Sequence, residues 1–471
     1  MKSIIKIENL IFEYMGEEDQ EPVKAINNIS LDIEEGSFTA IIGQNGSGKT
    51  ALIDAIELLK YALSGQTIPA NFCDYINIDA DSASLKYEFK VENMETKALY
   101  SSVYEVSIRK DLDDSAQNLI NDSEIHEKYK VTLFDEVLSY SYDNGEKKKK
   151  MLPVIDTRTS DAFAPKTKYD ALTGKNRSLE MDLLVAKKLA GATSRSFVFS
   201  KEMLAAIREN CKEAWHIFLI NSLVDYGHLS LFVINTANSG LISLNALPLA
   251  FRYEEKTRGA AGSLAFRLDG VSVIKQENFD IMKKVIDNMN IVLTQIIPGL
   301  TISIKDLGAQ IMKDGQSGYR IQMISQRNGK EIPLQYESDG IKKIVSILQL
   351  LIVVYNNPSI TVAIDELDSG VFEYLLGEIL RIISEKGKGQ LIFTSHNLRP
   401  LETLDRGFIA FTTTNPSNRY MRLNNVKTNN NLRDFYYRDI VLGEQSEVVY
   451  EPTNNYKIAL AFREAGEMSG S

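Results

Sequence analysis

The fold of this 471-residue chain is decided at residues 39–50, which read Thr39-Ala40-Ile41-Ile42-Gly43-Gln44-Asn45-Gly46-Ser47-Gly48-Lys49-Thr50. An apolar run, a glycine-rich loop with the spacing GxxxxGK[ST] and an apolar pattern of helical period follow one another without a break. Such a loop lets backbone amides curl around a phosphate group at a helix N-terminus. Lys49 adds a positive charge at the β- and γ-phosphates, and the Thr50 hydroxyl is placed for Mg²⁺. The stretch predicts a strand, a phosphate-binding loop and a helix in succession.

Two later stretches supply the groups that phosphate chemistry needs. The apolar run 361–364 ends in Asp365-Glu366, and the apolar run 390–395 ends in His396. Adjacent carboxylates at a strand end divide the work: Asp365 would hold the Mg²⁺ shell, and Glu366 would orient and deprotonate the attacking water. His396 comes one strand later, where it can contact a γ-phosphate. For the other three histidines, His126, His216 and His228, we expect structural or surface roles.

Composition narrows the class of protein. Length predicts two or three domains, and 44 % apolar with 25 % charged residues is ordinary for a globular chain. Two cysteines, Cys73 and Cys211, make neither a disulfide framework nor a four-ligand zinc site. The first ten residues lack the apolar core of a signal peptide, and the apolar run 344–355 is too short to span a bilayer. We expect a cytoplasmic protein without membrane contact.

Charge disfavours nucleic acid as the main partner. The 53 Lys and Arg against 63 Asp and Glu give a net charge of −10, which repels nucleic acid on average. Residues 161–212 carry a weak local excess, with ten basic against six acidic residues. Nucleic-acid binding therefore stays open as an alternative with this segment as its only support.

Hydrophobic periodicity gives a coarse map of the chain. Strands in an antiparallel arrangement are predicted over 84–91, 99–109, 131–142 and 149–156, and helices over 179–225 and 278–297. Strands are also predicted over 228–234 and 263–268, and a hairpin over 300–312 and 319–326. Helix and strand then alternate up to residue 412, as in a parallel sheet. We predict three parts: 1–158 with the phosphate-binding loop and an antiparallel part, 159–298 as a mainly helical arm for dimerisation or partner binding, and 299–471.

The order of these parts resembles an ABC-type ATPase. Tyr14 lies about 30 residues before the phosphate-binding loop, or Walker A motif, and Asp365-Glu366 resembles the Walker B motif. Glu337-Ser338-Asp339-Gly340 is in the place of the ABC signature, and Leu367-Asp368-Ser369-Gly370 resembles the D-loop. The resemblance implies an α/β fold, an ABC-type P-loop ATPase head split by a long mixed β/α insert.

The same resemblance implies roles for single residues. ATP and Mg²⁺ would be bound in a homodimer or a larger homo-oligomer, where Ser338 and Gly340 reach the other protomer's γ-phosphate with the help of the signature helix dipole. Catalysis would use Glu366, Lys49, His396 and Ser338. The metal would be held by Thr50 and Asp365. The nucleotide would be contacted by Tyr14 stacked on adenine and by Asn45, Gly46, Ser47, Gly48, Lys49, Thr50, Ala51, Ser338, Gly340 and Asp368.

Spacing selects the branch of this group. Lys49 and Ser338 are 289 positions apart, whereas a transporter ATPase needs only about a hundred, so the chain resembles the OLD-type AAA ATPases related to RecF and SMC. Asp339 replaces a small glycine of the signature, which predicts slow turnover. No Q-loop glutamine is found in the insert. The 75 residues after His396 contain no acidic DxD cluster, so a nuclease domain does not fit there.

Chains of this length in the group resemble ATPase subunits of anti-phage defence systems of the PARIS and RloA types, which pair an ATPase with a separate nuclease or toxin. The resemblance implies an ATP-hydrolysing switch or sensor that controls an effector encoded nearby. The alternatives are a RecF-like DNA-repair ATPase and a scaffold that ATP stabilises with little turnover. A transporter ATPase is disfavoured by both the signature and the spacing.

Overall fold

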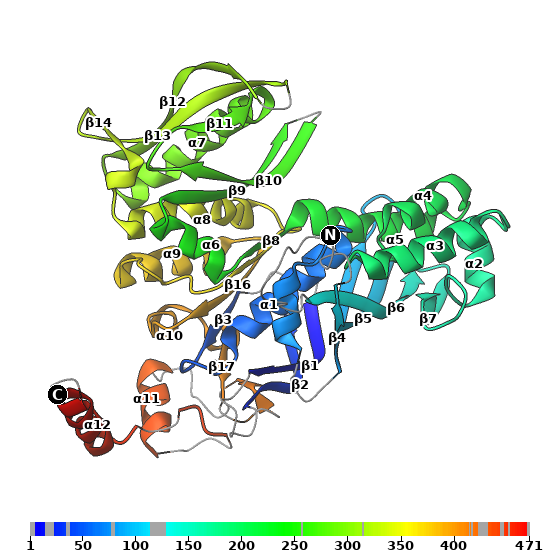
Figure 1. Ribbon diagram of the computed structural model, residues 1–471, viewed down its shortest axis with the longest axis horizontal. Helices are drawn as coiled ribbons and strands as arrows, with labels where there is room; N and C mark the ends of the chain where they lie inside the picture. The colour runs from blue at the N-terminus through cyan, green and yellow to red at the C-terminus, as the bar shows by residue number, and fades with distance from the viewer. Residues whose placement is uncertain are drawn as a thin grey trace, which may run out of the picture.

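Two six-stranded sheets organise the chain, one parallel and one antiparallel, and helix α1 (Lys49–Leu63) packs between them (Figure 1). The computed structural model describes residues 5–14, 23–33, 38–76, 81–113, 129–255, 258–312, 315–413, 415, 418–422, 432–442, 447–450 and 453–468. The predicted α/β class, with a head split by a long mixed β/α insert, is confirmed.

The first sheet is parallel except at one edge and has the order β18-β17-β3-β16-β15-β8. Its strands are continuous apolar runs, as expected where both faces are covered. Alternate residues of β3 face two separate cores, Ile41 toward α1 and Phe38, Ala40 and Ile42 toward α8 and α9. The elements are β3 (Phe38–Ile42), β8 (Leu231–Ile234), β15 (Thr361–Ile364), β16 (Gln390–Ser395), β17 (Ile409–Thr412), β18 (Tyr420–Met421), α8 (Asp339–Asn356) and α9 (Glu373–Lys386).

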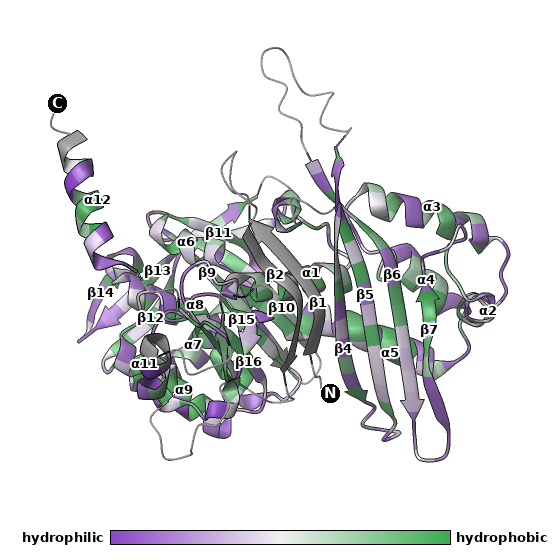
Figure 2. Cartoon of the chain, turned by 90° about the horizontal axis from the view of Figure 1, so that it is seen from below, coloured by the Kyte–Doolittle hydropathy of each residue, from purple (hydrophilic) through white to green (hydrophobic). Residues whose placement is uncertain are grey.

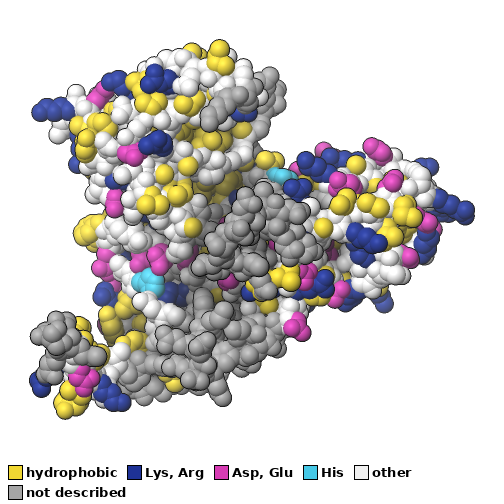
Figure 3. Space-filling model, viewed as in Figure 1, with side chains coloured by type: hydrophobic (Ala, Val, Ile, Leu, Met, Phe, Trp, Pro, Cys, Tyr) yellow, Lys and Arg dark blue, Asp and Glu magenta, His cyan; other side chains and the backbone are white. Residues whose placement is uncertain are grey.

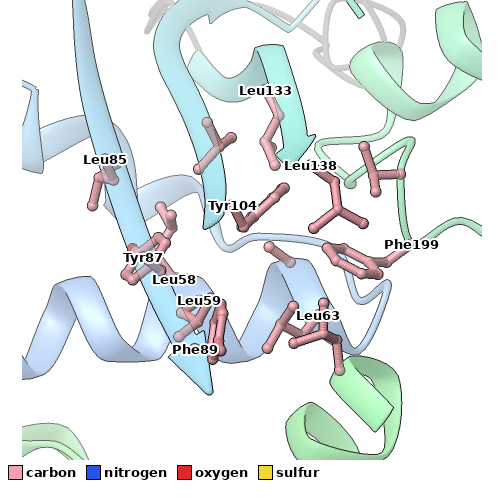
Figure 4. Close-up of a cluster of buried hydrophobic side chains, with 14 of the residues drawn as sticks. Leu58, Leu59, Leu63, Leu85, Tyr87, Phe89, Tyr104, Leu133, Leu138 and Phe199 are labelled. Atoms are coloured by element: carbon pink, nitrogen blue, oxygen red, sulfur yellow. The ribbon is translucent and has the colours of Figure 1, made fainter. Parts of the chain in front are cut away.

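The second sheet is antiparallel, with the order β2-β1-β4-β5-β6-β7. Buried and more exposed residues alternate along β4, which is typical of a sheet covered on one face. That face packs on α1, and Figure 4 shows Tyr87 and Phe89 of β4 beside Leu58 and Leu59 of the helix. The Tyr87 hydroxyl donates to the Ala55 carbonyl at 2.8 Å. The strands are β1 (Ile5–Tyr14), β2 (Val23–Ile33), β4 (Ser82–Glu92), β5 (Leu99–Leu112), β6 (Tyr129–Asp143) and β7 (Lys148–Asp156).

Four helices form an arm over the outer strands of this sheet, at the right in Figures 1 and 2. A buried carboxylate joins the arm to the sheet: Glu136 of β6 accepts from the Tyr104 hydroxyl and from the Phe197 amide, both at 2.7 Å, and from the Ser196 hydroxyl. Three hydrogen-bond donors thus satisfy this buried carboxyl group. The helices are α2 (Lys166–Thr173), α3 (Leu179–Ala192), α4 (Lys201–Asn210) and α5 (Ala214–Asp225).

The arm contains a histidine that makes its stability depend on pH. His216 of α5 is fully buried, its Nδ1 is hydrogen-bonded to the Tyr140 hydroxyl, and burial lowers its pKa from 6.5 to about 4. The unfolded chain takes up this proton below pH 6.5 and the folded chain only below about 4. The free energy of unfolding should therefore fall as the pH drops through this window, by roughly 3 kcal/mol in total.

The fluorescence of Trp215 can follow this loss. Trp215 is the only tryptophan of the chain, and its ring stacks on His216 with centroids 3.7 Å apart. Urea unfolding followed by this signal at pH 7 and pH 4.5 should give a smaller pH dependence for His216→Phe than for the wild type. Equal dependence in the two proteins would contradict the assignment to His216.

A third region lies on the other side of the parallel sheet, at the top of Figure 1. A hairpin of β9 and β10 packs beside α8, and β11, β13 and β12 form a further sheet that carries β14 and packs on α7. The elements are α6 (Thr236–Ser243), β9 (Ala246–Glu255), β10 (Arg258–Arg267), β11 (Ser272–Lys275), α7 (Gln276–Ile296), β12 (Leu300–Ile311), β13 (Ser317–Arg327) and β14 (Lys330–Pro333).

After β16 the chain forms the short α10 (Pro400–Thr403) and, beyond β18, α11 (Leu432–Leu442) and α12 (Asn455–Met468). Helix α12 projects away from the body in both Figure 1 and Figure 2. Throughout the described ranges, no helix combines the length and the apolar character that crossing a membrane requires.

Most predicted elements are confirmed, including the four antiparallel strands, the long helix α7 and the hairpin β12–β13. One local prediction is wrong, and one confirmed strand has a partner that the sequence did not predict. The strand expected over 228–234 begins only at Leu231, because Tyr226–Ser230 continues α5 as a π-helical turn. Residues 263–268 have a strand partner that was not expected, because β9 contains Pro248, which weakens its strand pattern.

The segment 159–298, predicted as a mainly helical arm, contains the helices α2 to α7 and also the strands β8 to β11. Two of these strands belong to sheets that continue outside the segment: β8 pairs with β15, and β11 pairs with β13. Strand pairing therefore crosses the boundary predicted between residues 298 and 299.

Candidate nucleotide-binding site

The phosphate-binding loop starts at the end of β3 and closes at the N-terminus of α1, so the predicted order of strand, loop and helix is confirmed. Gly48 caps the helix in the left-handed region with φ of 80°, which a residue with a Cβ adopts only with strain. A cavity of about 220 Å³ opens above the loop. It is lined by Asn45, Gly46, Ser47, Gly48, Lys49, Thr50, Glu366 and His396.

Lys49 lies across the loop. Its Nζ donates to the carbonyl oxygens of Gly43 at 3.0 Å and Gln44 at 2.8 Å. Burial lowers the pKa of this ammonium, while the charges of Asp365 and Glu366 oppose that shift. Lys49 also lines the cavity above the loop.

One hydrogen bond joins the two halves of the site. The Thr50 hydroxyl donates to Asp365 Oδ2 at 3.0 Å, although 315 positions separate the two residues. Asp365 is fully buried and follows β15, whose neighbour β16 lies between it and β3 in the sheet. The sheet thus brings the two predicted metal ligands together at one edge.

Glu366 is held in an unusual backbone conformation. Its φ is 47°, in the left-handed region, which costs of order 1–3 kcal/mol for such a residue and persists only where the surroundings fix it. Its amide donates to Thr394 Oγ1 at 2.8 Å, and that hydroxyl donates to Asp365 at 2.5 Å. A single buried hydroxyl on β16 therefore holds the carboxylate of Asp365 and the backbone of Glu366.

Two further predicted site residues, Asp368 and His396, lie in the loops that follow β15 and β16. Glu366 Oε1 and His396 Nε2 are 3.5 Å apart, and both side chains are part-exposed toward the cavity. Asp368 does not line this cavity. Its carboxylate accepts from the His396 amide at 3.2 Å and the Asn397 amide at 2.9 Å, so that it positions the histidine loop.

The signature residues lie elsewhere in the protomer. Ser338 caps α8, is exposed, and accepts from the Ile341 amide at 3.4 Å. Gly340 approaches Gly370 of the D-loop so closely that a Cβ would lie 2.2 Å from the Gly370 carbonyl oxygen. Neither Ser338 nor Gly340 lines the cavity of its own protomer.

Two other predicted contacts are also outside the cavity lining. Ala51 is buried within α1. Tyr14 ends β1, but its side chain lies outside the described residues, so that its stacking on adenine stays a prediction.

The sequence did not point to Asn235. It follows β8, whose Ile234 pairs in register with Ile364, so Asn235 lies at the same sheet edge as Asp365. Its amide donates to both oxygens of Glu57 at 3.2 and 3.0 Å, and its Oδ1 accepts from the Asn238 amide at the start of α6. The sequence signal that could have indicated Asn235 is an apolar run that ends in a polar residue, the same pattern that indicates Asp365.

Two further buried groups surround the carboxylates. Burial, followed by the charges of Asp365 and Glu57, raises the pKa of Asp54 on α1 to about 7. Lys343 of α8 is 3 % exposed and its Nζ donates to the Ser239 hydroxyl. Burial lowers the pKa of Lys343, against the charges of Glu366 and Asp365. Of these two groups, only Lys343 of α8 brings a basic side chain close to the carboxylates.

The residues fit a magnesium–nucleotide complex. Over the described residues, no group of three or more His, Cys, Asp and Glu side chains could hold a metal ion. Mg²⁺ differs from metals that need such a group, because it binds through one or two protein oxygens together with substrate phosphates and water. Thr50 and Asp365 supply two such oxygens. The N-terminus of α1 and Lys49 supply positive charge for phosphates.

Comparison with known proteins agrees with this geometry. The RecF/RecN/SMC N-terminal domain family model matches residues 21–418. The chain is 52 % identical over 52 residues to the energy-coupling factor transporter ATP-binding protein EcfA1 of Clostridioides difficile, over 11 % of this chain and 18 % of that protein. It is 32 % identical over 145 residues to EcfA2 of Clostridium perfringens, over 31 % of this chain and 48 % of that protein. The chain thus spans less than half the length of these relatives.

Among solved structures, the Smc head domain of Pyrococcus furiosus with an extended coiled coil, bound to the C-terminal domain of ScpA, aligns at 14 % identity with a TM-score of 0.37, over 90 % of this chain and 96 % of that chain. The family model extends over most of the sequence and includes the phosphate-binding loop, the carboxylate pair and His396. The chain belongs to the RecF/RecN/SMC N-terminal domain family.

Proposed function

We propose that this protein is the ATP-binding and ATP-hydrolysing switch subunit of an anti-phage defence complex, in which it controls a separate nuclease or toxin. The observation that carries the ATPase part is the Thr50–Asp365 hydrogen bond beneath a cavity lined by Glu366 and His396. The defence part rests on the resemblance of the ESDG signature and the long mixed insert to OLD-type ATPases.

The side chains around the cavity suit water attack on a γ-phosphate. Glu366 takes a proton from the water. His396, whose Nε2 lies 3.5 Å from Glu366 Oε1, contacts the phosphate. Lys49 moves from the loop carbonyls to the β- and γ-phosphates. Thr50 and Asp365 would hold Mg²⁺, and the ion would neutralise phosphate charge.

We propose further that two protomers share each nucleotide. The exposed Ser338 at the N-terminus of α8 supports this arrangement, because it does not line the cavity of its own protomer. A helix N-terminus favours the negative charge of a phosphate. The site would be complete only when a second copy docks.

Mixing variants tests the shared site. Lys49→Ala and Ser338→Arg should each abolish hydrolysis alone, whereas an equimolar mixture should recover about a quarter of the wild-type rate, since half of randomly formed two-fold dimers contain one intact composite site. The control is a mixture of Lys49→Ala with Glu366→Gln, which leaves no intact site in any pairing. A first mixture as inactive as the control would contradict the shared site.

The effector is sought by affinity purification. Glu366→Gln, expressed with its neighbouring genes, should retain a stoichiometric partner of nuclease or toxin character, identified by mass spectrometry. Recovery of the ATPase alone, or with replication and repair proteins, would overturn the defence proposal and leave the ATPase proposal standing.

One observation favours the RecF-like alternative. A cavity of about 1050 Å³ lies between the outer strands of the antiparallel sheet and α3. Six basic side chains and three acidic ones line it: Arg109, Lys130, Arg158, Lys187, Lys188 and Arg195, with Asp111, Asp135 and Glu136. Figure 3 shows Lys and Arg side chains recurring over this arm. Duplex DNA that neither binds at low salt nor changes ATP hydrolysis would remove this candidate.

A further inference from the structure

We propose that Tyr420 is a positioning residue for the phosphate-binding loop: its buried hydroxyl holds the Gly48 carbonyl, and with Thr412 it makes the β17–β18 hairpin a support that shapes the loop for phosphate. This inference rests on the proposed binding of ATP and names a part of the chain that the binding requires.

The contact to Gly48 is direct. The Tyr420 hydroxyl donates to the Gly48 carbonyl oxygen at 2.7 Å, and the tyrosine is 6 % exposed. The Gly48 carbonyl and the Lys49 amide belong to one peptide unit, which is planar and trans. Fixing the carbonyl oxygen on the protein side therefore directs the Lys49 N–H toward the opposite side, where Gly48 and Lys49 line the cavity.

A second contact holds the preceding residue. The hydroxyls of Ser47 and Thr412 are 2.5 Å apart, and the Ser47 hydroxyl also donates to the Gln44 carbonyl at 2.7 Å. Thr412 and Tyr420 face each other across the β17–β18 pair. One cross-strand pair thus holds two consecutive residues of the loop.

The hairpin itself is anchored to the strand that leads into the loop. Residues of β17 pair in parallel with β3, and Phe411 lies opposite Ile42, the last residue before the loop. Thr412, the next residue of β17, therefore lies beside the start of the loop. Since backbone N–H groups bind phosphate only in the right orientation, a support beneath the loop should appear as nucleotide affinity rather than as turnover.

Tyr420→Phe removes the hydroxyl and keeps the ring. We expect the dissociation constant for a fluorescent ATP analogue with Mg²⁺ to rise about fivefold to tenfold, as for one lost hydrogen bond. KM for ATP should rise with it, while kcat changes little. The matched control is Tyr87→Phe, which deletes a buried hydroxyl that donates at 2.8 Å to the Ala55 carbonyl of the same helix, two turns beyond the loop (Figure 4).

Both tyrosine variants should lose comparable thermal stability, and only Tyr420→Phe should lose affinity. Equal affinity of Tyr420→Phe and the wild type would overturn the inference, as would an equal loss in Tyr87→Phe. If Tyr420→Phe does not fold, Thr412→Val tests the same support through Ser47 and should weaken binding. A wild type that binds no ATP analogue would overturn the proposed function together with this inference, whereas normal binding by both hairpin variants would overturn the inference alone.

Discussion

Replacing Glu366 with glutamine should lower ATP turnover by about 100-fold or more while nucleotide binding is retained, because a positioned general base contributes roughly 10²–10⁴ in rate. Glutamine keeps the shape of the side chain, and its backbone amide can still donate a hydrogen bond to Thr394. It cannot take a proton from water. With hydrolysis blocked, ATP should also hold protomers together. We therefore expect a larger species with ATP than without it, measured by size-exclusion chromatography alongside phosphate release.

The control for this variant is Glu378→Gln. Glu378 is on α9, where it pairs with Arg381 on the surface. Its replacement makes the same chemical change at a residue that does not line the cavity. Its turnover and elution should match those of the wild type. A parental hydrolysis rate in Glu366→Gln would show that another group acts as the base.

Replacing Lys49 with alanine should weaken ATP binding by about 100-fold, the size expected when a buried charge-assisted contact to phosphate is lost. The loop would also lose the two bonds that Lys49 makes to its carbonyls, so its backbone would be less constrained before ATP arrives. Isothermal titration calorimetry with MgATP measures the change directly.

Lys60→Ala provides the comparison. Lys60 is on the same helix, its ammonium lies over the Phe232 ring, and burial lowers its pKa as it does for Lys49. Its loss removes the same charge three turns from the loop. Similar losses of affinity in the two variants would mean that helix charge in general, rather than the Lys49 contact, governs binding.

Much of the site was accessible from sequence because it consists of local patterns. The glycine spacing before Lys49 and the apolar runs that end in Asp365 and His396 are each readable within ten residues. The parallel sheet then places them at one edge by topology alone. The residues that orient these groups could not be found in this way. Thr394 and Tyr420 have ordinary sequence surroundings, and only their contacts reveal their roles.

The insert was less predictable for a related reason. A strand of four residues such as β8 has no periodicity that tells which sheet it joins, and its partner β15 lies about 130 positions later. Asn235 therefore looked like a loop residue. In β9, Pro248 faces Ala265 across a two-stranded hairpin, a place where its missing N–H is tolerated although its strand pattern is weak.

The strand order of the parallel sheet also constrains how the chain can fold during synthesis. Strand β3 ends at Ile42, but its neighbours β16 and β17 begin only at Gln390 and Ile409. At about 5–20 residues per second, the ribosome needs roughly 20–70 s to supply them. During that interval β3 has both edges unpaired, which is a recognised route to aggregation. Nascent chains should therefore depend on chaperones until the last third has emerged, and truncations that end before β16 should be insoluble.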